Sequence, residues 1–105
     1  MDLAQKNRAR AEALLQIDEV VGAVNKRQEA LARQRKEIDV ELEFYQGDVN
    51  KAPSWLKRKL EDNEQQVQIQ KRFLADQAQE KQRINGRFDE ELTKLKQLWA
   101  TGIKP

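Results

Sequence analysis

The chain has 105 residues, of which 36% are charged, 38% are hydrophobic and only 6% are aromatic. This composition is typical of long helices and coiled coils, so we expect a single helical-hairpin domain over residues 1–105 in which burial is narrow. The 20 basic and 18 acidic residues leave a net charge of +2, and so weak a field does not indicate nucleic acid as a partner.

Several residue types and segments are absent from the sequence. The chain contains no Cys and no His, which excludes disulfides, thiolate nucleophiles and zinc–thiolate sites. No run approaches the ~20 apolar residues of a membrane span, and the N-terminal stretch lacks the apolar core of a secretory signal. We therefore expect a cytoplasmic protein with no membrane span.

The first predicted helix covers about residues 3–45. Asp2 is a good N-cap and Gln5 follows three residues later, which is the pattern of a capping box. The heptad a and d positions are apolar in nine of thirteen cases, and a repeat kept over six heptads favours a coiled coil. These positions are Leu3, Asn7, Arg10, Leu14, Ile17, Val21, Val24, Gln28, Leu31, Arg35, Ile38, Leu42 and Tyr45.

Residues 46–54 predict a loop between two antiparallel helices. Gly47 can take the left-handed conformation that closes a helix. Pro53 disfavours helical geometry at Ala52, because its ring clashes with the preceding residue. Ser54 is a candidate N-cap for the helix that follows.

The second predicted helix covers about residues 55–100. Eight of its thirteen a and d positions are apolar. Asn85-Gly86 is a turn signal in other contexts, so a third helix over residues 87–100 is an alternative. Ile84 and Phe88 keep the heptad phase across this dipeptide, which favours one continuous helix.

The register set by the loop places Arg10 opposite Glu91 and Glu41 beside Lys59. It also brings the acidic end of the first helix next to the basic start of the second. Such pairs select a register more than they stabilise it, since exposed ion pairs contribute only ~0–1 kcal/mol. The predicted fold is all-α: an antiparallel two-helix coiled-coil hairpin that dimerises into an elongated four-helix bundle.

No residue pattern indicates catalysis, a cofactor or a metal. The carboxylates fall on helix surfaces among basic residues, and a two-stranded hairpin offers no cavity of the size that ligands usually occupy. Asp89-Glu90-Glu91 could suggest a metal site, but a solvated helix face is the simpler interpretation. The basic runs at 33–36, 57–59 and 71–72 are interleaved with acidic residues, so direct nucleic-acid binding is disfavoured.

Small and large apolar residues flank the predicted seam near the chain ends. We interpret Ala4, Ala11, Val20, Leu92 and Trp99 as a self-association surface of a homodimer. Polar residues in the seam would leave a lone hairpin marginal and favour a higher oligomer. The alternative is that these flanking residues only widen the core of the hairpin itself.

Large apolar residues also gather at the predicted loop. The candidate partner-binding tip comprises Phe44, Tyr45, Val49, Trp55 and Arg58, because aromatics beside Arg are typical of binding hot spots. The alternative is a local hydrophobic cap that folds the loop over the end of the hairpin.

These observations favour a non-catalytic protein–protein interaction module, such as a small adaptor, chaperone-like or scaffold subunit, with an unidentified protein partner. Two other hypotheses stay open. One is a nucleic-acid-associated accessory protein, which salt-dependent binding would reveal. The other is a regulatory subunit of a larger enzyme, which co-purification would reveal.

Overall fold

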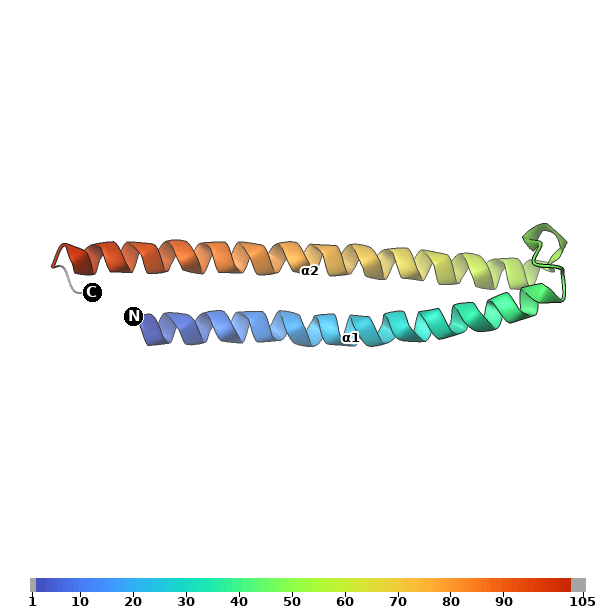
Figure 1. The fold of residues 1–105 in the computed structure, drawn as a ribbon, viewed down its shortest axis with the longest axis horizontal. Coiled ribbons are helices and arrows are strands. Elements are labelled where there is room, and N and C mark those ends of the chain that lie inside the picture. The colour runs from blue at the N-terminus through green and yellow to red at the C-terminus, as the bar shows by residue number, and fades with distance from the viewer. Residues whose placement is uncertain (1, 103–105) are drawn as a thin grey trace. The chain divides into compact units, whose positions relative to one another are not determined.

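The computed structural model describes residues 2–102 and is all-α in this part. Helix α1 covers Leu3–Glu43, a short 3-10 helix η1 covers Val49–Lys51, and helix α2 covers Ser54–Ala100 (Figure 1). Helix α2 continues through Asn85-Gly86, so the alternative of a third helix is wrong. Neither described helix has an apolar stretch long enough to cross a membrane.

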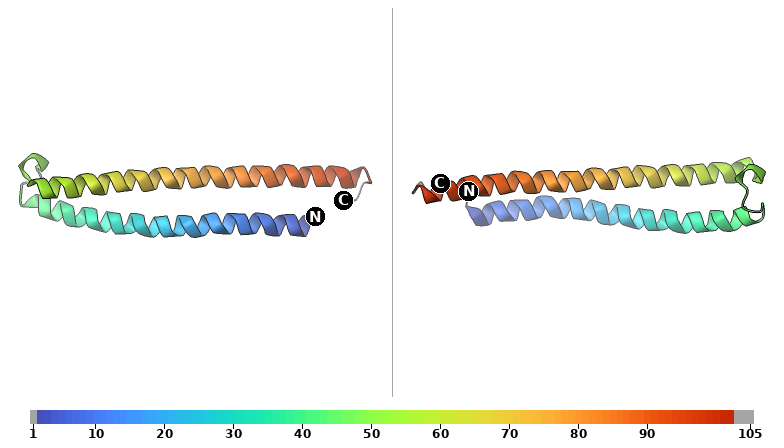
Figure 2. Two further views of the ribbon diagram at one scale, coloured as in Figure 1. Left: turned by 180° about the vertical axis from the view of Figure 1, so that it is seen from behind. Right: turned by 45° about the horizontal axis from the view of Figure 1, so that its top comes forward.

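The chain divides into two compact units. Unit 2 comprises Gly22–Leu74, and unit 1 combines the residues up to Val21 with those from Ala75 onward. In each unit a segment of α1 runs alongside a segment of α2 in the opposite direction, as the further views of Figure 2 also show. The predicted two-helix antiparallel hairpin is confirmed.

The turn of unit 2 closes α1 with two successive left-handed residues. The Gly47 amide donates to the Leu42 carbonyl at 2.9 Å, and the Gln46 amide donates to the Glu43 carbonyl at 3.0 Å. This pair of bonds is a Schellman motif, in which the residue before the final donor takes the left-handed conformation. That residue is Gln46, with φ of 59°, and Gly47 follows with φ of 71°. The prediction for Gly47 is confirmed, but Gln46 shares its role.

A second set of local bonds connects the turn to α2. Asp48 caps η1, because its carboxylate accepts a hydrogen bond from the Asn50 amide at 2.9 Å. The carbonyl of Pro53 accepts from the amide of Lys57 at 3.1 Å, so Pro53 occupies the N-cap position of α2. Ser54 is therefore the first residue inside the helix, and its predicted capping role is wrong.

The core of unit 2 lies next to this turn. Its buried cluster consists of Ile38, Leu42, Ala52, Leu56 and Leu60, with Tyr45 packed against it. Ala52 is buried because the chain is extended there, with ψ of 151°, and this conformation turns the residue toward the seam. Ile38 and Leu56 are fully buried.

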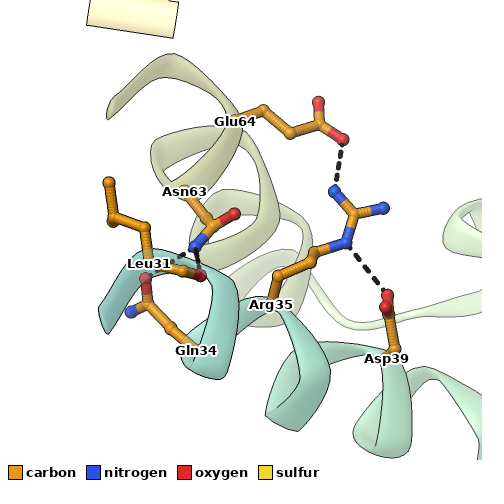
Figure 3. Close-up of polar contacts among 6 residues, drawn as sticks. All are labelled: Leu31, Gln34, Arg35, Asp39, Asn63 and Glu64. Atoms are coloured by element: carbon orange, nitrogen blue, oxygen red, sulfur yellow. Dashed lines mark hydrogen bonds and ion pairs between the residues drawn. The ribbon is translucent and has the colours of Figure 1, made fainter. Parts of the chain in front are cut away.

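One polar residue is buried in the same seam. Asn63 is 3% exposed, and its Nδ2 donates to the Leu31 carbonyl and to Gln34 Oε1, both at 2.9 Å (Figure 3). An amide at a seam position loses these bonds when the two helices shift past one another. Asn63 therefore specifies the helix register of unit 2.

Unit 1 begins with the predicted capping box. The Gln5 amide donates to Asp2 Oδ1 at 2.8 Å, and the Asp2 amide donates back to Gln5 Oε1 at 3.1 Å. Two amides that no helical carbonyl could satisfy are thereby bonded, which fixes the start of α1.

Ion pairs between α1 and α2 hold unit 1 together. Lys6 bonds Glu91 at 2.6 Å, and Lys81 bonds Asp18 at 2.9 Å. The predicted Arg10–Glu91 pair is wrong, because Arg10 pairs with Asp89 at 2.8 Å in a geometry that is not aligned for a hydrogen bond. The guanidinium of Arg10 extends over the buried ring of Phe88, 5.7 Å from its centroid, and this path leads it to Asp89.

Candidate interaction surfaces

The tip residues of unit 2 separate into a packed set and an exposed set. Tyr45 is half-buried and packs on the core cluster. Phe44 is 83% exposed and Trp55 is 57% exposed. Val49 and Arg58 are also exposed. The hydrophobic-cap interpretation is therefore wrong for Phe44 and Trp55, and the cap is made by Tyr45 and Ala52 instead.

Helical geometry explains why Phe44 is exposed. Phe44 follows the exposed Val40 by four residues, and residues at this spacing lie on the same side of a helix. The buried Leu42 marks the opposite side. The two residues and Glu43 surround a shallow depression of about 230 Å³. Val40 was not among the predicted tip residues, although its spacing from Phe44 is visible in the sequence.

The ion pair between Glu41 and Lys59, 3.6 Å apart, was predicted and is confirmed. It marks one flank of unit 2, where α1 and α2 lie side by side. Glu41 and Lys59, the positions three residues after or four residues before them, and the repeats of these positions every seven residues lie on the same flank. We call this surface the Glu41–Lys59 flank; its outer residues are Ala30 and Glu37 of α1, Phe44 directly after the end of α1, and Trp55, Asp62, Ile69 and Phe73 of α2.

A different ion-pair set marks the opposite flank of unit 2. Arg35 Nε donates to Asp39 Oδ1 at 3.0 Å, and Nη1 donates to Glu64 Oε1 at 2.9 Å (Figure 3). The hydrogen bond to Asp39 is the first cause that raises the pKa of Arg35 above its ordinary value, and the bond to Glu64 is the second. The guanidinium therefore stays charged at any physiological pH.

A groove of about 590 Å³ lies beside this ion-pair set, so the expectation that the hairpin offers no hollow of ligand size is wrong. Apolar Leu31, Ala32 and Val67 line it together with polar side chains that include Arg35, Glu64 and Lys71. Arg35 and Glu64 pair with each other, whereas Lys71 forms no ion pair within residues 2–102. The exposed large apolar side chains of unit 2, apart from Val40 and Val49, all lie on the Glu41–Lys59 flank instead.

The predicted self-association residues do not form one surface. Ala4 and Ala11 are exposed and lie seven residues apart on one side of α1. Leu92 is half-buried and Trp99 is 38% exposed, also seven apart on one side of α2. Val20 follows Ala11 by nine residues, which places it on the other side of α1.

The surroundings of Val20 support this separation. Val20 borders a shallow cavity of about 270 Å³ together with Ala13, Ile17 and Ile84, none of which is among the other four predicted residues. At the other end of unit 1, α2 continues past the level at which α1 begins (Figure 1). Four of the five residues thus remain a candidate surface.

The acidic run once considered for metal binding has other partners. Asp89 pairs with Arg10, and Glu91 pairs with Lys6 and lies 4.0 Å from Arg87. The hydrogen bond from Lys6 is the main reason that the pKa of Glu91 falls below its ordinary value. Asp89 and Glu91 therefore lie on a helix face and link α1 to α2 through ion pairs.

Comparisons with known proteins find no match among family models, curated proteins or solved structures.

Proposed function

We propose that this chain is a non-catalytic protein–protein interaction module, an adaptor, chaperone-like or scaffold subunit of the cytoplasm. The observation that carries the proposal is the exposure of Phe44 and Trp55 beside a well-buried core. Unit 2 buries five apolar residues in its core cluster, yet two of its largest apolar side chains, Phe44 and Trp55, are exposed to solvent. Exposed aromatics that are not needed for folding are typical of binding surfaces.

Homodimerisation is the second part of the proposal. Ala4, Ala11, Leu92 and Trp99 of unit 1 combine small and large side chains, so two copies can pack closely there as a coiled-coil four-helix bundle. The same unit buries only Ile17 and Phe88 among its described apolar residues. A second copy would cover the apolar surface that the unit's own helices leave exposed.

Side-chain contacts weaken the nucleic-acid alternative only in part, because six residues of the basic runs form no ion pair within residues 2–102: Arg33, Lys36, Lys57, Arg58, Lys71 and Arg72. Lys6, Arg10, Arg35, Lys59 and Lys81 each pair with a carboxylate. Basic side chains that already face acidic partners release fewer counterions from a phosphate backbone.

Affinity capture from the native host tests the partner surface. We expect Phe44→Ala/Trp55→Ala to lose captured partners, with affinity reduced roughly 30-fold or more, because truncating hot-spot aromatics costs 2 kcal/mol or more. Leu15→Ala, at an apolar site in unit 1 that is as exposed as Trp55, is the matched control. Loss of helicity in the tip variant, or capture that is unchanged, would contradict the proposal.

Sedimentation velocity tests the dimer. Leu92→Ala/Trp99→Ala should shift the chain toward monomer, while Val40→Ala in unit 2 should not. A wild-type chain that is monomeric throughout the micromolar range would overturn the homodimer.

A further inference from the structure

The Glu41–Lys59 flank of unit 2 is built in layers. One series is Ala30 and Glu37 of α1 and Phe44 directly after its end, each seven residues apart, and the other is Trp55, Asp62 and Ile69 of α2, also seven apart. Because the helices are antiparallel and Glu41 bonds Lys59, these six residues pair by level. The order is an aromatic layer, an acidic layer and an aliphatic layer.

The layers differ in what they offer a partner. Phe44 and Trp55 at one end are exposed, and so is Ile69 (48%) beside the small Ala30 at the other end. Successive layers are about 10 Å apart, since seven helical residues rise ~1.5 Å each. Two apolar anchor sites therefore lie about 20 Å apart on one side of the unit.

The middle layer is negatively charged. Glu37 and Asp62 are exposed, and within residues 2–102 neither of them belongs to an ion pair. The neighbouring charges of Glu41 and Lys59 offset each other. A cation placed between the two anchor sites would meet two carboxylates that form no ion pair within residues 2–102, with Arg33 and Arg58 one helical turn before them.

We propose that this flank receives a helix of another protein that carries apolar residues fourteen positions apart and Lys or Arg midway between them. The inference rests on the proposed function and specifies the chemistry of the partner. A helix repeats the same side every seven residues, so one such helix would place its apolar side chains on both anchor sites and its basic residues on Glu37 and Asp62.

A second copy of the chain fits this flank poorly. The acidic layer lies in the middle, between two apolar layers, so it stays in the middle when the order is reversed. Two copies that matched their apolar layers, in either direction, would place four carboxylates at one level. Because like charges that face each other in an interface repel, this arrangement strongly disfavours binding of a second copy.

The test uses the full chain and two synthetic helical peptides. Both carry Leu at two positions fourteen residues apart; one has two Arg midway, and the other has two Glu there. Fluorescence anisotropy should show about tenfold or greater preference for the Arg peptide, and this preference should weaken as salt rises. Equal binding of the two peptides would overturn the proposal.

Matched charge variants locate the effect. Glu37→Gln/Asp62→Asn should remove the preference for the Arg peptide, whereas Glu29→Gln/Glu61→Gln, which neutralises two exposed acids away from this flank, should keep it. All four sites are exposed, so circular dichroism should show unchanged helicity. The proposal would be overturned if Glu37→Gln/Asp62→Asn kept the preference for the Arg peptide, or if both charge variants lost it equally.

Two outcomes separate this inference from the proposed function. In the first outcome, a native partner no longer binds Phe44→Ala/Trp55→Ala but still binds Glu37→Gln/Asp62→Asn. This result would support the interaction module and would overturn the proposed role of the acidic middle layer. A wild-type dimer that dissociates with Phe44→Ala/Trp55→Ala would show that a second copy occupies the flank, and it would overturn the inference in favour of self-association.

Discussion

The two units are built from the same two helices but are held together by different interactions. Unit 2 buries a continuous apolar cluster of five residues next to its turn. Unit 1 buries only Ile17 and Phe88 among its described apolar residues, and ion pairs such as Lys6–Glu91 and Lys81–Asp18 connect its helices. The two units therefore show which kind of contact stabilises a pair of helices.

Magnitudes decide between the two kinds of contact. Full burial of a Leu side chain contributes about 1.5–3 kcal/mol, whereas an exposed ion pair contributes ~0–1 kcal/mol and is screened by salt. The pairs of unit 1 are all partly exposed. Unit 2 should therefore be the more stable of the two, and unit 1 should open first.

The largest effect should come from the cluster itself. Leu56→Ala removes a fully buried side chain and should lower the free energy of unfolding by about 2–5 kcal/mol in urea titrations followed by circular dichroism. Phe88→Ala should instead raise amide hydrogen exchange within unit 1 and shift the main transition less. An equal loss in both variants would break the comparison between the units.

Glycine substitutions should give a smaller effect whose sign depends on the backbone. Gly47→Ala should destabilise by about 1–2 kcal/mol, because a left-handed conformation strains any residue with a Cβ. Gly22→Ala should stabilise by about 1 kcal/mol, because Gly22 lies inside α1 and a Cβ there meets nothing within 4 Å. Thermal midpoints would measure both, and the same sign in both variants would contradict the turn geometry.

The smallest effect concerns the acid sensitivity of unit 1. The pKa of Glu91 is lowered mainly by its hydrogen bond from Lys6, so the folded state binds this proton less readily than the unfolded state. The pair therefore stabilises unit 1 above the ordinary Glu pKa, and this contribution is lost as pH falls through the lower, folded pKa. A carboxyl NMR titration should show the shift, and Lys6→Met should return the pKa toward its ordinary value. A wild-type Glu91 pKa at its ordinary value would show that the Lys6–Glu91 hydrogen bond does not stabilise unit 1.

Local features of this chain were predictable because short-range rules govern them. The capping box of Asp2 and Gln5, the left-handed Gly47 and the Glu41–Lys59 pair all appear as expected. Each depends on residues a few positions apart, or on the heptad spacing that follows from 3.6 residues per turn. The all-α antiparallel hairpin follows from the same periodicity.

Features that depend on three-dimensional packing were not predictable in this way. Gln46 takes a left-handed conformation because the Schellman bonds require it, although its residue type does not favour it. Arg10 forms an ion pair with Asp89, with its guanidinium over the ring of Phe88. Long side chains have many rotamers of similar energy, so the neighbour across the seam selects among them.

The two helices, the position of the turn between them and the apolar stripe along which they pack follow from the sequence pattern alone. That Tyr45 and Ala52 cover the core while Phe44 and Trp55 are exposed is visible only in the folded chain. Helical periodicity sets which residues share one side of a helix. How far the neighbouring helix covers that side depends on the path of the turn, and this turn leaves one flank of unit 2 uncovered.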